Sequence, residues 1–251
     1  MDTYSATSKT GNLLLDSLDP TEREDLLAGA ETQPIEVGHV FLSPGDPITE
    51  VLFPRSGTLS VVTEPRIGQR VEAATVGREG VGSVHSALGS RVSGQELVGQ
   101  VSGEGIAVEV DLFSKLSSQP GQLQDLIHGY LEAFFAQASL SAGCNAVHHL
   151  NERCARWLLL THDRVDSDTF DLKQEFLAVM LGVQRPSVSI SAGTLQEAGL
   201  ITYRRGSITI LDREGLEQAT CPCYEMIRSE YSRLVPLANG QVRTDAGSGE
   251  S

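Results

Sequence analysis

The sequence has little cysteine and no long apolar run. Its 251 residues include four cysteines, which are too few for a scaffold held together by disulfides. No apolar stretch reaches the ~18 residues that a membrane-spanning helix needs. The polar N-terminus lacks the basic-then-apolar pattern of a signal peptide. We therefore expect a cytoplasmic globular protein that has no membrane partner.

Basic side chains are also scarce. Lysine and arginine together number 19, against 33 aspartate and glutamate residues, so the formal net charge is −14. This charge argues against binding of nucleic acid by the surface as a whole. The acidic excess lies mainly in residues 1–146. Residues 173–209 instead carry four basic side chains and two acidic ones, so this short segment is locally basic.

Composition and periodicity divide the chain into five parts. Between residues 35 and 110, short β-branched runs alternate with glycine and proline turn signals, which is typical of an antiparallel sandwich or barrel. The expected parts are a disordered tail over 1–12, a β-roll over 13–118, a long helix over 119–146, a helical and hairpin domain over 147–219, and a C-terminal tail over 220–251.

The long helix carries a regular apolar seam. Leu123, Ile127, Tyr130 and Phe134 are spaced four, three and four residues apart, which is the seam of a helix pair. The spacing predicts that two copies of the chain associate through these residues. The alternative is that this helix packs on the sheet of its own chain.

Residues 172–200 carry the strongest functional signal. The pattern predicts a helix over 173–181, a turn at Gly182 and a second helix that begins near Arg185. Helix, tight turn and helix form the plan of a DNA-binding helix-turn-helix. The β-branched runs on both sides of residues 204–207 predict a hairpin tipped by two arginines, so the unit is a winged helix.

The exposed side chains of this unit are candidates for contacts with double-stranded DNA. Arginine pairs with guanine and glutamine with adenine, while lysine, serine and the wing arginines suit phosphates. The candidates are Lys173, Gln174, Gln184, Arg185, Ser187, Ser189, Arg204 and Arg205. The positions expected to face the core of the second helix are Val188, Leu195 and either Ala192 or Ile190.

The order of these parts resembles the CRP/FNR family of bacterial transcription regulators, and the stretch KQEFLAVMLGVQRPSVSISAGTLQEAGLI resembles it most closely. The resemblance implies an α+β fold with a double-stranded β-helix (a jelly roll like that of cyclic-nucleotide-binding domains), a dimerisation helix and a winged helix-turn-helix. It also implies a homodimer that binds inverted repeats in DNA, senses a small-molecule effector through the β-roll, and has RNA polymerase as a further partner.

The region that resembles an effector pocket departs from the cyclic-AMP pattern. In that pattern a Gly-Glu pair holds the ribose and a later arginine pairs with the phosphate. Here Ser83 follows Gly82, and Ser93 stands near the position of the arginine. A buried phosphate without a charge partner is costly, so ordinary binding of cyclic AMP is not expected. The residues that line an altered pocket, or alternatively form a solvated turn, are Arg78, Glu79, Gly82, Ser83 and Arg91.

The sequence indicates no metal and no cofactor. Iron–sulfur members of the family carry an N-terminal cysteine cluster, whereas residues 1–143 contain no cysteine. Side chains that could hold a metal or oxidise are Cys144, His148, His149, Cys154 and the pair in Cys221-Pro222-Cys223. Their spacing is not that of a known ligand set, so ordinary packing is expected. Haem ligands by chemistry alone, without a motif, are His39, His85 and His128.

The recognition helix also departs from the family. Pro186 and Ile190 occupy positions where members often have Glu and Arg, which predicts a different DNA half-site. A ligand-sensing module whose winged domain contacts protein is the alternative that the negative charge favours. An enzyme is not expected, because the sequence has no metal-ligand motif, nucleophile elbow or phosphate loop.

Overall fold

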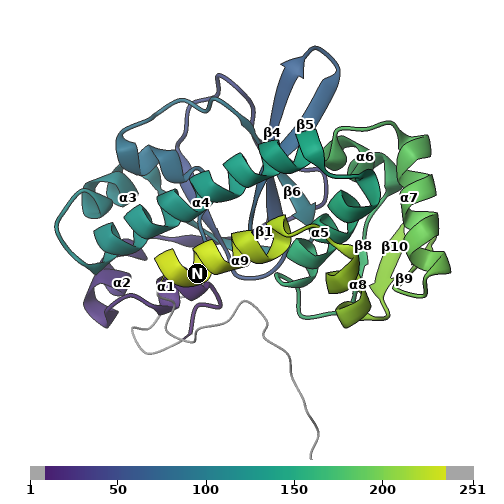
Figure 1. Cartoon of the computed structure of the whole chain (residues 1–251). Coiled ribbons are helices and arrows are strands. Elements are labelled where there is room, and N and C mark those ends of the chain that lie inside the picture. Colours follow the sequence, from purple (N-terminus) through teal and green to yellow (C-terminus); the bar gives the residue numbers. More distant parts are fainter. Residues whose placement is uncertain (1–8, 236–251) are drawn as a thin grey trace, which may run out of the picture.

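The structure is a computed structural model that describes residues 9–235. It has a β-rich N-terminal part and a helical C-terminal part, and the long helix α4 (Gln122–Val147) runs along both, as Figure 1 shows. The predicted α+β class is confirmed. Within this described range, no helix combines the length and hydropathy that a membrane span requires.

The N-terminal part is a roll of two antiparallel sheets. The strands follow the order β1-β7-β3 in one sheet and β2-β6-β4-β5 in the other. Apolar side chains of both sheets, among them Ile35, Leu59 and Leu97, pack together between them, as alternation along a strand requires. The strands are β1 (Glu31–Ile35), β2 (Val40–Leu42), β3 (Glu50–Pro54), β4 (Thr58–Arg66), β5 (Gln69–Val76), β6 (Glu96–Val101) and β7 (Gly103–Glu109).

Short helices close the roll. They are α1 (Leu13–Asp16), α2 (Pro20–Leu26), the 3-10 helix η1 (Val84–Leu88) and α3 (Val110–Ser117). Helix α2 begins as its sequence predicts, because Asp19 accepts a hydrogen bond from the Thr21 backbone N–H and Pro20 opens the first turn.

The expected tail over 1–12 needs correction at its end, since residues 9–12 are part of the fold and residues 1–8 lie outside the described range. The buried amide of Asn12 donates hydrogen bonds to the carbonyl oxygens of Pro54 (2.8 Å) and Gly80 (2.9 Å). Its side-chain oxygen accepts from the Leu15 backbone N–H at 3.0 Å. A polar side chain whose hydrogen bonds are all satisfied can be buried, so polarity alone was a poor guide here.

The C-terminal part contains the predicted helix-turn-helix and hairpin, both of which are confirmed. Its small sheet has the strand order β8-β10-β9. The elements are α5 (Leu150–His162), β8 (Thr169–Asp171), α6 (Gln174–Leu181), α7 (Arg185–Glu197), β9 (Ile201–Arg204), β10 (Ser207–Ile210) and α8 (Arg213–Ala219).

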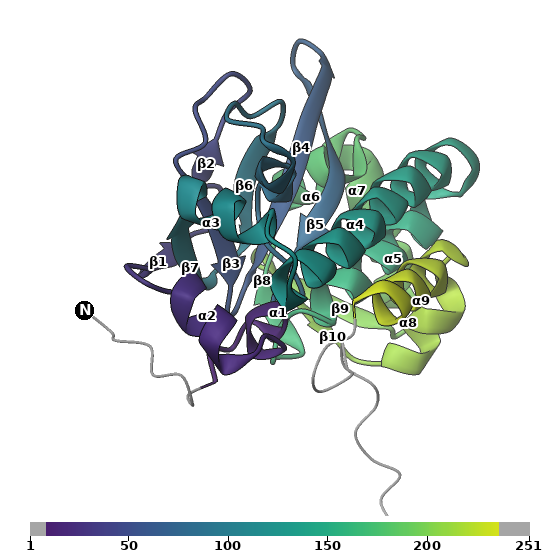
Figure 2. The same cartoon turned by 90° about the vertical axis from the view of Figure 1, so that its left-hand side faces the viewer.

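A further helix, α9 (Cys223–Leu234), lies where a tail over 220–251 was expected. It packs along α4, as Figures 1 and 2 both show. The backbones approach so closely that a Cβ atom at Gly129 would collide with the carbonyl oxygen of Leu234. The Tyr231 hydroxyl donates to the Gln137 side chain at 2.8 Å. The expected tail is therefore corrected for residues 220–235, and residues 236–251 lie outside the described range.

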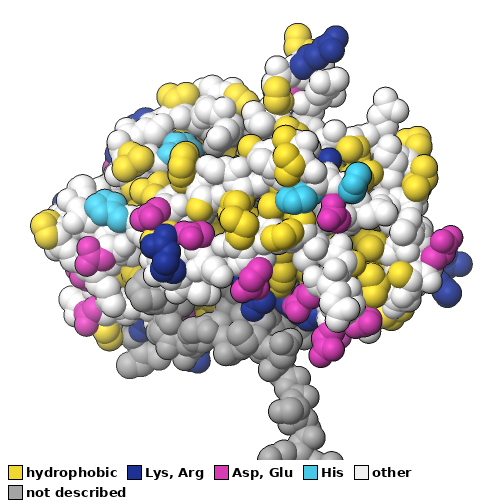
Figure 3. Space-filling view, viewed as in Figure 1, with side chains coloured by type: hydrophobic (Ala, Val, Ile, Leu, Met, Phe, Trp, Pro, Cys, Tyr) yellow, Lys and Arg dark blue, Asp and Glu magenta, His cyan; other side chains and the backbone are white. Residues whose placement is uncertain are grey.

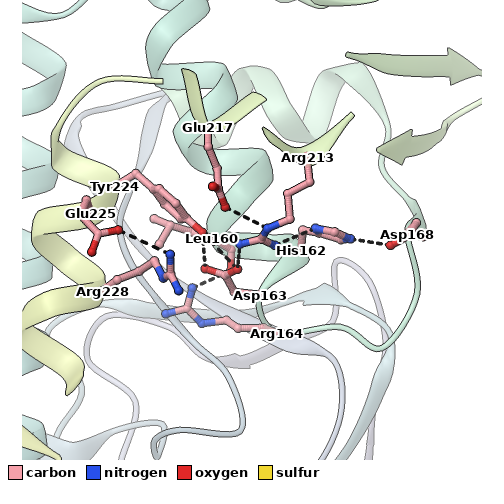
Figure 4. A network of polar contacts seen from close by, with 10 residues as sticks. All are labelled: Leu160, His162, Asp163, Arg164, Asp168, Arg213, Glu217, Tyr224, Glu225 and Arg228. Atoms are coloured by element: carbon pink, nitrogen blue, oxygen red, sulfur yellow. Dashed lines mark hydrogen bonds and ion pairs between the residues drawn. The ribbon is translucent and has the colours of Figure 1, made fainter. Parts of the chain in front are cut away.

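A buried polar network fixes α8 and α9 to the end of α5 (Figure 4). The fully buried carboxylate of Asp163 accepts hydrogen bonds from Arg213 at 2.6 Å and from the Tyr224 hydroxyl at 3.0 Å. Arg213 also contacts Glu217 at 2.9 Å and the His162 ring at 2.9 Å. Because the charges are paired and the polar atoms satisfied, this network can be buried at acceptable cost.

The four residues of the predicted dimer seam lie inside this chain. Leu123, Ile127 and Tyr130 are buried and Phe134 is half-buried. The ring of Tyr130 occupies the space where a Cβ atom at Gly80 would lie. The expected contact between two copies through these residues is therefore corrected. These side chains pack on the roll of their own chain and on α9.

Candidate nucleic-acid interface

The helix-turn-helix is shaped by its turn and by the start of α7. Gly182 has φ of 63°, a left-handed conformation that suits glycine at the end of a helix. Pro186 lies in the first turn of α7, where its missing N–H costs nothing. Val188 and Ala192 are buried, whereas the side chain of Ile190 is 72% exposed. The structure therefore chooses Ala192 over Ile190 as the inward position.

Side chains from three elements meet at the N-terminal end of α7. Lys173, Gln174, Arg185 and Arg205 border one open hollow between α6, α7 and the hairpin. Ser189 joins two of these elements, because its hydroxyl donates to the Gln174 side-chain oxygen at 2.8 Å. Of the remaining predicted DNA contacts, Gln184 and Arg204 are exposed and Ser187 is half-buried. This surface presents donors and positive charge together, as contact with phosphates and base edges requires.

Glu175 was missed by the sequence analysis. Its carboxylate forms an ion pair with Arg185 at 3.0 Å, and both side chains are 62% exposed. An exposed pair of this kind contributes less than about 1 kcal/mol, so DNA could displace it. The two residues are ten positions apart on different helices, and no sequence pattern reveals such a pair. The orientation of Ile190 was left open by the sequence, and its exposed apolar side chain suits the methyl group of thymine.

The tip of the hairpin is strained. Arg205 has φ of 52° and Gly206 has φ of 82°, while Arg204 and Ser207 pair across the strands. Two central residues with positive φ make a type I′ turn, which normally holds asparagine or glycine. An arginine in this conformation costs about 1 kcal/mol or more. Such a cost is consistent with a functional role for the Arg205 side chain.

The residues of the expected effector pocket do not gather around one cavity. Glu79 is buried and pairs with Arg164 from the end of α5, with 2.8 Å between its Oε1 and the arginine Nε. Arg78 pairs with Asp166 at 3.0 Å. Both side chains therefore hold the roll to the C-terminal part. Gly82 packs against core leucines, and Arg91 forms an ion pair with Asp111 of α3 at 3.0 Å.

A small cavity with both apolar and polar walls does lie between the roll and α4. Its volume is about 20 Å³, and of the five expected pocket residues it is bordered by Ser83 alone. The other walls include Val61, Val76, Phe134 and His85. Burial lowers the pKa of His85. A cavity of this size holds about one water molecule, which is far too small for a nucleotide.

Glu72 of β5 is a titratable group between the roll and α5. Its carboxylate accepts hydrogen bonds from the hydroxyl of Ser60 (2.5 Å) and from the indole N–H of Trp157 (2.9 Å). Removal from water raises the pKa of Glu72 to about 7, although these hydrogen bonds and the nearby Arg156 and Arg164 act in the opposite direction.

Between pH ~5 and pH ~8, we expect the free energy of unfolding of the wild-type chain to fall by about 2 kcal/mol more than that of the Glu72→Gln variant. The folded-state pKa lies above the ordinary value of 4.5, so the folded protein holds a proton that the unfolded chain releases. This stabilisation is present at low pH and is lost as the pH rises through about 7. Glutamine keeps both hydrogen bonds without titrating. Urea unfolding at several pH values measures the difference, and parallel profiles for the two proteins would contradict it.

The cysteines fall into two groups. Cys144, Cys221 and Cys223 are buried together with His148 beside them. Cys154 lies instead in the main core. His149 is exposed and begins α5. The structure therefore brings Cys144 and His148 next to Cys221 and Cys223, which are distant from them in the sequence.

Comparison with known proteins agrees with this architecture. A model of the Crp-like helix-turn-helix domain matches residues 152–219, and no curated protein matches the sequence. Among solved structures, a transcriptional regulator of the crp/fnr family from Eubacterium rectale aligns with 84% of this chain and 99% of its own at 16% identity, with a TM-score of 0.65. FixK2 from Bradyrhizobium japonicum aligns over 76% and 98% at 15% identity, with a TM-score of 0.65.

A third similar structure is TTHA1359, a CRP/FNR-family regulator from Thermus thermophilus. It aligns with 75% of this chain and 97% of its own at 21% identity, with a TM-score of 0.60. At such identities the likeness shows the fold, and the matched domain shows the DNA-binding unit. Residues 152–219 therefore form a Crp-like helix-turn-helix domain, and most of the chain has the fold of CRP/FNR-family regulators.

Proposed function

We propose that the protein acts in the bacterial cytoplasm as a homodimer that binds an inverted repeat in DNA and thereby regulates transcription, with RNA polymerase as a partner. The observation that carries the proposal is the meeting of Lys173, Gln174, Arg185 and Arg205 beside the exposed start of α7. In a chain with a net charge of −14, a local basic surface supports binding by a specific face rather than by general attraction.

The second copy has an available surface on α4. Its exposed positions follow a spacing of three and four residues, from Glu132 through Phe135, Ser139 and Ala142 to Ala146. This exposed stripe of α4 is distinct from the buried seam expected from the sequence. Phe135 is 72% exposed, and Figure 3 shows apolar side chains gathered on the face that α4 crosses. Small residues beside one large apolar side chain suit the close packing of two helices.

Phe135→Glu should convert the dimer to a monomer, with at least a tenfold loss of association. In a symmetric dimer the change acts twice, removing apolar burial worth about 1.5–3 kcal/mol per side chain and adding two charges to the interface. Sedimentation or light scattering at micromolar concentration measures the mass. Val92→Glu is the matched control, because Val92 is also exposed (55%) but lies on the roll, where it pairs with Pro47. An unchanged dimer in Phe135→Glu would refute an interface through this stripe.

The geometry of the effector domain favours a ligand other than a cyclic nucleotide. The cavity between the roll and α4 is about 20 Å³, and the carboxylate of Glu79 is already paired with Arg164. A nucleotide would therefore find neither space nor a free acidic group at this position. We infer a divergent effector domain whose ligand, if it takes one, is not held in the manner of cyclic AMP.

Selection from random duplex DNA at fixed salt tests the proposal directly. We expect the purified chain, or the chain with cell extract that supplies its effector, to enrich an inverted repeat. Its half-sites should lie about one helical turn (~34 Å) apart, the spacing of two recognition helices in a symmetric dimer. Failure to enrich any repeat under both conditions would contradict the proposal and favour a winged domain that contacts protein.

A further inference from the structure

Four metal-binding side chains meet where α4 ends and α9 begins. Cys144 and His148 lie one helical turn apart at the end of α4, Cys221 follows α8, and Cys223 is the first residue of α9. All four ligand atoms lie within 4.8 Å of one another. The sulfur atoms of Cys144 and Cys221 are 3.4 Å apart, and Cys223 Sγ lies 3.7 Å from His148 Nδ1.

This donor set is that of a structural zinc site. Three thiolates and one imidazole form a Cys₃His tetrahedron, with Zn–S bonds of ~2.3 Å and Zn–N bonds of ~2.0 Å. Sulfur atoms in such a tetrahedron lie roughly 3.8 Å apart. The cluster therefore needs only small side-chain movements to surround an ion. Four protein ligands close the coordination sphere and leave no open position for substrate, which favours a structural role over catalysis.

The surroundings suit a cluster with negative charge. A divalent ion with three thiolates and a neutral imidazole has a formal charge of −1, which is costly to bury without a partner. The guanidinium of Arg156 is buried and acts electrostatically on all three cysteines. Its Nε has no hydrogen-bond partner among the described residues. A buried cation beside a metal site stabilises thiolate ligands.

We propose that Cys144, His148, Cys221 and Cys223 bind a thiophilic divalent cation, Zn²⁺, in a closed tetrahedral site. The site joins segments that are 73 residues or more apart in the sequence. His148 is also the C-cap of α4, and α5 begins two residues later at Leu150. The ion thus holds α9 against α4 and fixes the joint through which α4 passes into the winged domain.

The test uses the full chain without an affinity tag, purified under reducing conditions with added zinc. Elemental analysis should find one zinc ion per chain. Replacement with Co²⁺ should produce the thiolate-to-metal charge-transfer bands and the intense visible bands of tetrahedral cobalt. Titration against a chelating dye gives the affinity of the wild-type chain, so this measurement does not depend on whether any variant folds.

Matched variants assign the ligands. His148→Ala and Cys223→Ser should each weaken zinc binding by tenfold or more, as the loss of one ligand of four requires. The controls are His149→Ala and Cys154→Ala, which change the same residue types outside the cluster and should keep full occupancy. A chelator should lower the melting temperature of the wild-type chain and of the controls, and it should have little effect on the ligand variants.

Three results would overturn the proposal. The wild-type chain could fail to bind stoichiometric zinc or to show the cobalt bands. The ligand variants could bind zinc as tightly as the controls. Mass spectrometry could find a Cys144–Cys221 disulfide in the metal-free chain. If zinc still did not bind after this disulfide was reduced, the cluster would be a redox pair. None of these results bears on the DNA-binding function, which the selection experiment tests separately.

Discussion

Glu79→Gln should lower the free energy of unfolding by about 3–5 kcal/mol, the range expected when one partner of a buried ion pair is removed. The side chains of Arg164 and Glu79 are only 5% and 2% exposed. The variant leaves the guanidinium buried without its counter-charge. Gly77 is part of the same arrangement, because a Cβ atom there would collide with the Arg164 side chain. Urea unfolding of the full chain measures the change.

The neighbouring pair provides the control. Arg78 and Asp166 also join the roll to the C-terminal part, but their side chains are 24% and 79% exposed. Asp166→Asn should therefore change stability by less than about 1 kcal/mol. The double variant Glu79→Leu with Arg164→Leu should recover most of the loss, since it removes both buried charges. A small effect of Glu79→Gln, similar to that of Asp166→Asn, would show that the pair is not a buried anchor.

Arg185→Ala should weaken binding to the selected DNA site by about 1–3 kcal/mol, or roughly 5-fold to 150-fold, and should relax the preference for one base pair. Arg185 lies in the first turn of α7, and its exposed side chain can reach a guanine for a bidentate contact. The ion pair between Arg185 and Glu175 is exposed, so breaking it offsets little of the free energy that a contact with DNA provides. Fluorescence anisotropy on the selected site and its single-base variants measures both effects.

Two other basic side chains separate base reading from general electrostatic attraction to DNA. Arg205→Ala should weaken binding to all sequences alike and reduce the salt dependence by about one phosphate contact. Lys115→Ala removes the same charge from an exposed position on α3, at the opposite end of the molecule from α7 (Figure 1), and should leave affinity nearly unchanged. If Arg185→Ala weakened every sequence equally, its role would be a phosphate contact. If Arg185→Ala had no effect, α7 would not be the recognition helix.

Local signals in the sequence predicted the helix-turn-helix well. Gly182, Pro186 and Gly206 specify turns and helix starts through their own backbone preferences, which depend on few neighbours. The exposed start of α7 followed from the same signals. The ion pair of Glu175 could not be predicted from these signals, because only the crossing of two helices brings its partner Arg185 close.

The long helix shows what periodicity leaves open. The spacing of Leu123, Ile127, Tyr130 and Phe134 correctly indicated an apolar face, but an apolar face does not specify which surface covers it. Part of this face of α4 is covered by α9, whose short segment was expected to be part of a C-terminal tail. Most of the stability of such a helix comes from tertiary packing rather than from its own residues, so its sequence carried only a weak signal.

The sequence by itself determined most elements of this protein, their order and the basic character of the winged domain, because turns, caps and apolar periods act over a few residues. The tertiary structure alone decided three pairings between distant segments: Glu79 with Arg164, α9 with α4, and Cys144 with Cys221 and Cys223. Each depends on atoms that approach one another only when distant segments of the chain pack together. Burial then decides their chemistry, since it strengthens the ion pair and gathers the thiols.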